Sequence, residues 1–172
     1  DLFSGTLHPF GGAIFAHHLE QVYGDESIRN VWETLQKRDP QSYSLDDIDV
    51  GMPLGASGNV MPRFWVWNYL TDTRSRSGYY TEAAELPSIK HTKANLVSGG
   101  TFSSTGRVDY LGAAYVSVET SGISGGIRGA FTLSNGATWN LIVLLIANGK
   151  VEVLRPQSHT VSIPNANRFQ EI

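Results

Sequence analysis

The hydrophobic positions of this chain follow the period of an α-helix in its first part and the period of a β-strand in its last part. The first apolar set has the i, i+4, i+7, i+8 spacing of an amphipathic helix: Phe15, Leu19, Val22 and Tyr23. Gly24 comes next, and glycine is favoured after a helix C-terminus because it accepts a left-handed backbone. The pattern therefore predicts an amphipathic helix that ends before Gly24.

A second helix is predicted to begin directly after this glycine, with Asp25 at the N-cap position. Its apolar face consists of Ile28, Val31, Trp32 and Leu35. A third helix is predicted to follow Asn59 as N-cap, with Pro62 in its first turn, and to contain the apolar run 64–70. This last run is apolar almost all round, which predicts burial on several sides. A short helix at 44–48 is predicted between the second and the third.

From residue 107 onward the apolar residues recur with a period of two. Strands are predicted over 110–118, 127–133, 137–146, 150–154, 159–163 and 168–172. Two Asn-Gly pairs separate strand-like runs, at 135–136 and at 148–149, and each favours a type I′ hairpin turn. The run 137–146 is apolar on both faces, which indicates a central strand. The pattern is typical of a small antiparallel β-sandwich, and the sequence leaves open whether a C-terminal strand is missing.

Together these elements predict an α+β fold, with a helical segment over 1–94 and an antiparallel β-sandwich over 95–172. Apolar residues make up 41% of the chain, which supplies a core and excludes intrinsic disorder. The net charge of -3 and the scattered Lys and Arg give no basic face, so we expect no nucleic-acid partner. No apolar run approaches the roughly 20 residues of a membrane-spanning helix. The chain has no cysteine, which excludes disulfides, thiolate ligands and thiol catalysis.

Both ends of the sequence lie close to predicted elements. The sequence begins at Asp1 rather than Met and enters a helical pattern within about ten residues. Its last residues, 168–172, resemble a strand. We therefore expect this sequence to be a piece of a larger protein.

His17 and Glu20 stand three residues apart on one predicted helix face, a spacing found in helical metal sites. Such sites take further ligands from neighbouring helices, and the sequence offers no second helix with His and Glu. A solvated helix face is the preferred interpretation. The acidic run 46–49 lacks the glycine and the glutamate of an EF-hand loop, so helix capping is preferred there. We predict no metal site in this chain.

His8 precedes the first helix, where a catalytic or oxyanion-binding histidine is one possibility and a helix-entry residue the preferred one. Trp65 and Trp67 have helical spacing and are expected in the core. Tyr79 and Tyr80 fall in a predicted loop, so they are the better candidates for binding a peptide or a carbohydrate. Because the chain has no nucleophile elbow, HExxH sequence or phosphate loop, we predict no complete catalytic site.

Four segments of the chain carry a family resemblance: Phe10-Gly-Gly-Ala-Ile-Phe15 continuing to Tyr23-Gly24, Ile28-Arg-Asn-Val-Trp32-Glu33, Phe64-Trp-Val-Trp67-Asn68-Tyr-Leu-Thr71, and Gly78-Tyr79-Tyr80 through Pro87. They resemble secreted bacterial HExxH zinc metallopeptidase-like proteins of the gluzincin kind. The resemblance spans roughly residues 8–90, and the β part agrees only in character. These motifs belong to helix packing and not to catalysis.

The resemblance implies that the zinc helix, the general-base glutamate and the third zinc ligand all precede this region. No position here matches a zinc ligand, so zinc is expected in the parent protein and not in this chain. His8 or His17 pointing into the catalytic cleft as a transition-state donor is a weaker implication.

We therefore expect a non-catalytic C-terminal segment of an exported protein, secreted or at the cell surface. It would scaffold the upstream catalytic segment and contact a substrate or partner. Two alternatives stay open. One is an extracellular carbohydrate- or peptide-binding module that acts through Tyr79 and Tyr80, and the other is a surface or adhesion component.

Overall fold

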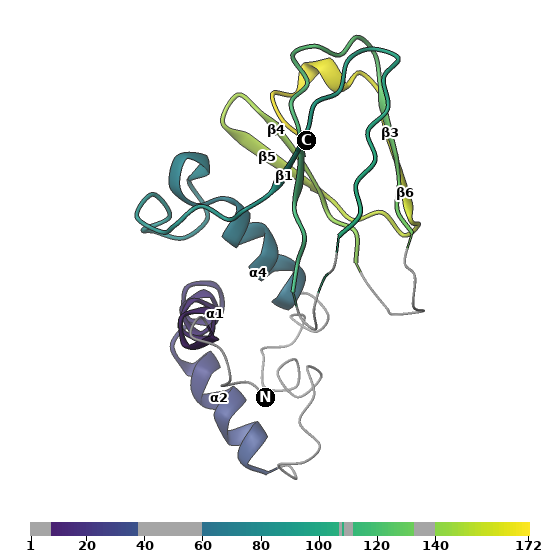
Figure 1. The fold of residues 1–172 in the computed structure, drawn as a ribbon. Coiled ribbons are helices and arrows are strands. Elements are labelled where there is room, and N and C mark those ends of the chain that lie inside the picture. Colours follow the sequence, from purple (N-terminus) through teal and green to yellow (C-terminus); the bar gives the residue numbers. More distant parts are fainter. Residues whose placement is uncertain (1–7, 38–59, 107, 109–111, 133–139) are drawn as a thin grey trace. The chain divides into compact units, whose positions relative to one another are not determined.

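The computed structural model describes residues 8–37, 60–106, 108, 112–132 and 140–172 (Figure 1). Helices come first and strands in small sheets follow, so the prediction of an α+β fold is confirmed. The chain forms two compact units. Unit 1 consists of Asp1–Asn68 and Ser77–Ala83, and unit 2 consists of Tyr69–Arg76 and Ala84–Ile172.

In unit 1, α1 (His8–Tyr23) and α2 (Glu26–Gln36) follow each other closely, as Figure 1 shows. Gly24 ends α1 with a φ of +87°, and its N–H donates to the Glu20 carbonyl over 2.8 Å. Its predicted role is confirmed. Asp25 is at the N-cap position of α2 as predicted, but its backbone angles are already helical and its side chain makes no capping hydrogen bond. The connection between the two helices is too short to leave Asp25 in the extended conformation that an N-cap needs.

The core between these helices consists of Leu19, Val31 and Val60, with Phe15, Tyr23, Ile28 and Leu35 packed against it. Trp32 was predicted on the same face of α2, and this is wrong because 69% of its surface is exposed. Residues one apart on a helix point about 100° away from each other. The face that carries Val31 therefore turns Trp32 toward solvent.

The third helix, α4 (Val60–Tyr69), is buried on several sides as predicted. Four residues at and after its C-terminal end have 6% of their surface exposed or less: Val66, Trp67, Tyr69 and Leu70. The short η1 helix (Asp72–Arg74) comes next. The predicted N-cap Asn59, the helix at 44–48 and the acidic run 46–49 lie outside the described residues.

Unit 2 contains three pairs of short strands. The bounds are β1 (Thr92–Ala94), β2 (Val116–Val118), β3 (Ile127–Ala130), β4 (Val143–Ala147), β5 (Lys150–Leu154) and β6 (Thr160–Ile163). β3 pairs with β6 and β4 with β5, both antiparallel, whereas β1 and β2 are parallel. The sequence pattern did not predict that parallel pair. Figure 1 shows β3 and β6 side by side, and β4 and β5 as a hairpin.

The hairpin of β4 and β5 has the turn that the sequence predicts. Asn148 and Gly149 have φ values of +50° and +74°, and Ala147 pairs with Lys150 across them. Both central residues of a type I′ turn need positive φ, which asparagine and glycine accept most readily. The other Asn-Gly pair, at 135–136, lies outside the described residues.

The last residues of the sequence connect β2 with β4. Val118 and Ile172 exchange two backbone hydrogen bonds of 2.7 and 3.0 Å, and Ile146 donates to the Glu171 carbonyl over 2.9 Å. Among the described strands β4 pairs along its length with β5 alone, in a two-stranded sheet, and a single bridge joins its Ile146 to Glu171. Its side chains contribute to the core of unit 2, which consists of Val143, Leu145, Ile163, Ala166 and Phe169. The short η2 helix (Ala166–Arg168) occupies the start of the predicted strand at 168–172.

Candidate functional site

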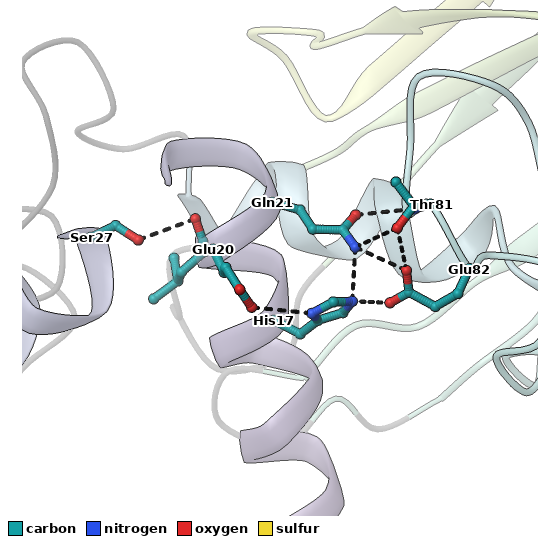
Figure 2. A network of polar contacts seen from close by, with 7 residues as sticks. His17, Glu20, Gln21, Ser27, Thr81 and Glu82 are labelled. Atoms are coloured by element: carbon teal, nitrogen blue, oxygen red, sulfur yellow. Dashed lines mark hydrogen bonds and ion pairs between the residues drawn. The ribbon is translucent and has the colours of Figure 1, made fainter. Parts of the chain in front are cut away.

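A polar network in unit 1 joins α1 to the loop at 81–82 (Figure 2). His17 Nε2 contacts Glu82 Oε1, and His17 Nδ1 lies 3.5 Å from Glu20 Oε2. The Gln21 amide nitrogen lies 2.9 Å from His17 Nε2 and donates to Thr81 Oγ1 and Glu82 Oε2, each over 2.9 Å. The Thr81 N–H donates back to Gln21 Oε1 over 3.1 Å.

The spacing along α1 explains one side of this network. His17, Glu20 and Gln21 are at positions i, i+3 and i+4, which share one helix face. The other side comes from a loop in which Gly78 has a φ of +90°, a conformation that glycine adopts without strain. The loop places Thr81 and Glu82 opposite α1.

The Glu82 carboxylate is stabilised in its charged form. The Thr81 hydroxyl donates to it over 2.5 Å and is the main reason that the pKa of Glu82 lies below its usual value. Partial burial opposes this shift, whereas the Gln21 amide and the nearby His17 add to it. The carboxylate is therefore ionised at neutral pH and able to hold its partners.

His17 has a carboxylate at each ring nitrogen, which fixes the orientation of the imidazole. Because Glu20 and Glu82 approach opposite nitrogens, the three side chains do not converge on one point. Within the described residues, no group of three His, Cys, Asp or Glu side chains is placed to hold a metal ion. The network of His17, Glu20, Gln21, Thr81 and Glu82 instead links α1 to the loop, and we call it the brace.

A pocket of about 420 Å³ adjoins this brace, and we call it the aromatic pocket. Its lining comes from α1, from α4 and from the loop after α4. The lining residues are Gln21, Val22, Arg63, Trp67, Gly78, Tyr79 and Thr81. Gln21 and Thr81 belong to both features, so the brace fixes one wall of the pocket.

Arg63 supplies the charge of this pocket. Its Cζ atom lies 5.8 Å from the centroid of the Trp67 ring and 5.9 Å from that of Tyr23. Both distances are within the range of cation–π attraction. The rings therefore hold the guanidinium in place although the residue itself is exposed.

Two tyrosines follow Gly78, and the structure places them differently. Tyr79 lines the aromatic pocket with its ring centroid 5.8 Å from that of Trp67, at an interplanar angle of 74°. Burial raises the pKa of Tyr79, and the charge of Arg63 opposes that rise. Tyr80 is only 2% exposed, packs edge-on against Trp67 and donates to Asn68 Oδ1 over 3.0 Å. Tyr80 thus supports the wall from behind.

His18 is fully buried behind the same wall, among the rings of Phe64, Trp67 and Tyr80. Neither of its ring nitrogens has a hydrogen-bond partner among the described residues. Burial, helped by the charge of Arg63, lowers the pKa of His18 to about 4. The imidazole is therefore neutral at pH 7.

Of the residues singled out from the sequence, Tyr79 lines the pocket and His17 belongs to the brace. His8 is the first residue of α1, and its side chain lies outside the described part of the chain. The sequence did not point to Glu82, which lies 65 residues from His17. Nor did it point to Arg63, although an arginine four residues before Trp67 on one helix is a recognisable signal for a cation–π pair.

Comparisons with protein families, with curated proteins and with solved structures found no match to this chain. None of the described helices is both long and apolar enough to cross a membrane.

Proposed function

We propose that this chain is a non-catalytic C-terminal segment of an exported metallopeptidase-like protein, and that its unit 1 binds a peptide in the aromatic pocket. The pocket is the observation that carries the binding role. Its volume of about 420 Å³ falls within the usual size of ligand sites, and it combines rings with a few fixed polar groups. The proposed parent protein rests on the resemblance of the helical segments described above.

The form of the pocket favours a peptide over a carbohydrate. A sugar ring stacks on a broad, exposed aromatic face. Trp67 exposes only 6% of its surface, and Tyr79 meets it at 74°, so the two rings form no flat platform. In this proposal a single side chain of a peptide packs beside these rings, next to Gln21 and Thr81 in the lining.

In this proposal the chemistry belongs to the upstream segment of the parent protein. Hydrolysis by zinc needs three protein ligands, an open coordination position and a base, all of which that segment would supply. Binding energy gained away from the reacting bond helps to position the substrate. Unit 1 would contribute that energy and scaffold the catalytic half.

Titration of the purified chain with a set of unstructured peptides, followed by NMR and calorimetry, tests the binding role. Substitution Tyr79→Ala should weaken peptide binding by about tenfold, because it removes one aromatic wall of the pocket. Trp32→Ala is the matched control, since it removes an exposed ring from α2 that does not line the pocket.

Equal affinities of the wild type and Tyr79→Ala would contradict the proposal. So would a chain that binds oligosaccharides and no peptide, which would favour the carbohydrate-binding module instead.

A further inference from the structure

Among the described residues, the guanidinium of Arg63 is held by its aromatic neighbours and not by an acidic partner. The ion pairs of the described residues join His17 to Glu20 and Glu82, and Arg29 to Glu26, and none of them involves Arg63. Every carboxylate of the brace is thus already engaged. Arg63 is the cation of the pocket that has no counter-charge among the described side chains.

Contact with aromatic rings leaves the hydrogen-bonding capacity of a guanidinium available. A guanidinium packs on rings through its flat face, whereas its five N–H donors point outward in its plane. Arg63 lies near the rings of Tyr23 and Trp67 at 5.9 and 5.8 Å. Those rings position it and accept no conventional hydrogen bond from its edge.

The other residues that line the aromatic pocket are all neutral. They are Gln21, Val22, Trp67, Gly78, Tyr79 and Thr81. An anion that enters the pocket therefore meets one positive charge in the lining, whereas the Glu82 carboxylate lies behind Gln21 and Thr81, to which it is hydrogen-bonded. The charge of Arg63 also acts on the pKa values of Tyr79 and of His18, so its field reaches the wall of the pocket.

From this arrangement we infer that the aromatic pocket selects peptides that carry a carboxylate, with Arg63 as the group that binds it and with Trp67 and Tyr79 contacting an adjacent apolar group. Two parallel N–H donors of a guanidinium match the two oxygens of a carboxylate. The carboxylate is either an acidic side chain or a free C-terminus, since both have the same chemistry. The inference rests on the peptide binding proposed above.

Matched peptides test this selectivity. One pair differs only in Glu against Gln, and another only in a free C-terminal carboxyl against a carboxamide. We expect the wild-type chain to bind at least one acidic member about tenfold more tightly than its neutral partner, and the pair that shows the preference identifies the source of the carboxylate. The preference should shrink as salt concentration rises.

Substitution Arg63→Gln should remove this preference, so that the acidic and the neutral member of each pair bind with the same affinity. Arg63→Lys keeps the charge without the planar pair of donors, so it should retain only part of the preference. Arg29→Gln removes a positive charge from exposed α2 and should retain all of it. Thermal unfolding of each variant shows that the chain is folded.

The possible outcomes separate the two proposals. Peptides that bind the wild type without a preference for the acidic member would overturn this inference and leave the binding role standing. An unchanged preference in Arg63→Gln would overturn the assignment to Arg63. If no peptide binds the wild type at all, both proposals fail.

Discussion

His18 combines full burial with two ring nitrogens that have no hydrogen-bond partner among the described residues. A buried polar group without a partner costs about 1–3 kcal/mol of stability. Its neighbours Phe64, Trp67 and Tyr80 surround it with rings and offer little to a charged imidazole. His18 is therefore accommodated in its neutral form, and its burial among the rings disfavours the protonated form.

The stability of unit 1 should consequently depend on pH through His18. Its pKa is about 4 in the folded chain and 6.5 as an ordinary value, so between these limits the unfolded chain binds more protons. The free energy of unfolding should be level above pH 6.5, fall as the pH drops toward 4 and level off below, with a total loss of roughly 3 kcal/mol. Urea unfolding at several pH values, followed by tryptophan fluorescence, measures it.

Substitution His18→Leu should flatten this dependence between pH 6.5 and 4.5, whereas His159→Gln in unit 2 should leave it unchanged. A His18→Leu chain with the wild-type slope would refute the assignment. Glu82 acts in a separate and lower range. Because its pKa is lowered in the folded state, its contribution is present above its usual value of 4.5 and is lost as the pH falls through the folded value.

Glu82 also allows a direct test of the brace. Glu82→Gln removes the charge that faces His17 and one acceptor of the Gln21 and Thr81 hydrogen bonds. The pair is about one third exposed, so the expected loss at pH 7 is only about 1 kcal/mol or less, and added salt should reduce it. Glu33→Gln on exposed α2 is the control, and an equal loss in both variants would argue against the brace.

At the scale of the elements, Tyr69 connects distant parts of unit 2. Its hydroxyl donates to Glu171 Oε1 over 2.6 Å, across 102 residues of sequence. Its ring stacks on Tyr115 at 5.5 Å, and the Arg74 guanidinium lies 4.5 Å from its centroid. Burial, followed by the hydrogen bond to Glu171, raises the pKa of Tyr69 far above its ordinary value. The hydroxyl therefore stays protonated and remains a donor.

A double-mutant cycle with Tyr69→Phe and Glu171→Gln measures this link. Hydrogen bonds to charged groups contribute about 1.5–3 kcal/mol, so we expect a coupling energy of at least about 1 kcal/mol in the stability of unit 2. Hydrogen exchange at the Val118 and Ile146 amides reports on it, since both donate to the last two residues. Strictly additive single substitutions would show that the contact does not stabilise the unit.

Local patterns made the helices and one hairpin predictable from the sequence. The periodicity of α1 and the turn at Asn148 and Gly149 depend on residues close together in the chain. Trp32 was wrongly predicted to be buried, because the four apolar positions of α2 spread over a wider arc of the helix than the core of unit 1 covers. The parallel pairing of β1 with β2 depends on residues more than 20 positions apart, which no local signal encodes.

In the candidate site too, features that depend on neighbouring residues were predictable from the sequence, and contacts between distant residues were not. The place of Tyr79 in a loop was predictable, because its neighbours in the sequence indicate a turn, and the structure shows that it lines the aromatic pocket. Glu82 reaches His17 only when the loop folds against α1, so their 65-residue separation hides the pair. Arg63 was not singled out from the sequence because its partners are aromatic rings and not carboxylates.

At the scale of the whole molecule, the proposed peptide binding belongs to unit 1 alone. Unit 1 holds the aromatic pocket and the brace, whereas unit 2 has its own core and its own long-range pairing. In the proposed parent protein, an upstream segment would perform the hydrolysis.

A comparison of two proteins tests this division of labour. The longer protein that includes the upstream segment should show peptidase activity that chelation abolishes, and this chain alone should show none. Zinc titration of this chain should give no stoichiometric binding, because no three His, Asp or Glu side chains of the described residues are placed to hold a metal ion. Stoichiometric zinc in this chain alone would contradict the proposed role.

The pairing of the last residues with β2 and β4 has a consequence for biosynthesis. Val118 and Ile146 are translated well before Glu171 and Ile172, yet their amides find their backbone acceptors only in those two residues. During translation unit 2 therefore cannot complete this pairing, and part of two strands stays unsatisfied, until Glu171 and Ile172 have been synthesised and have left the ribosomal tunnel. A ribosome stalled a few residues earlier should hold a helical unit 1 beside a protease-sensitive unit 2.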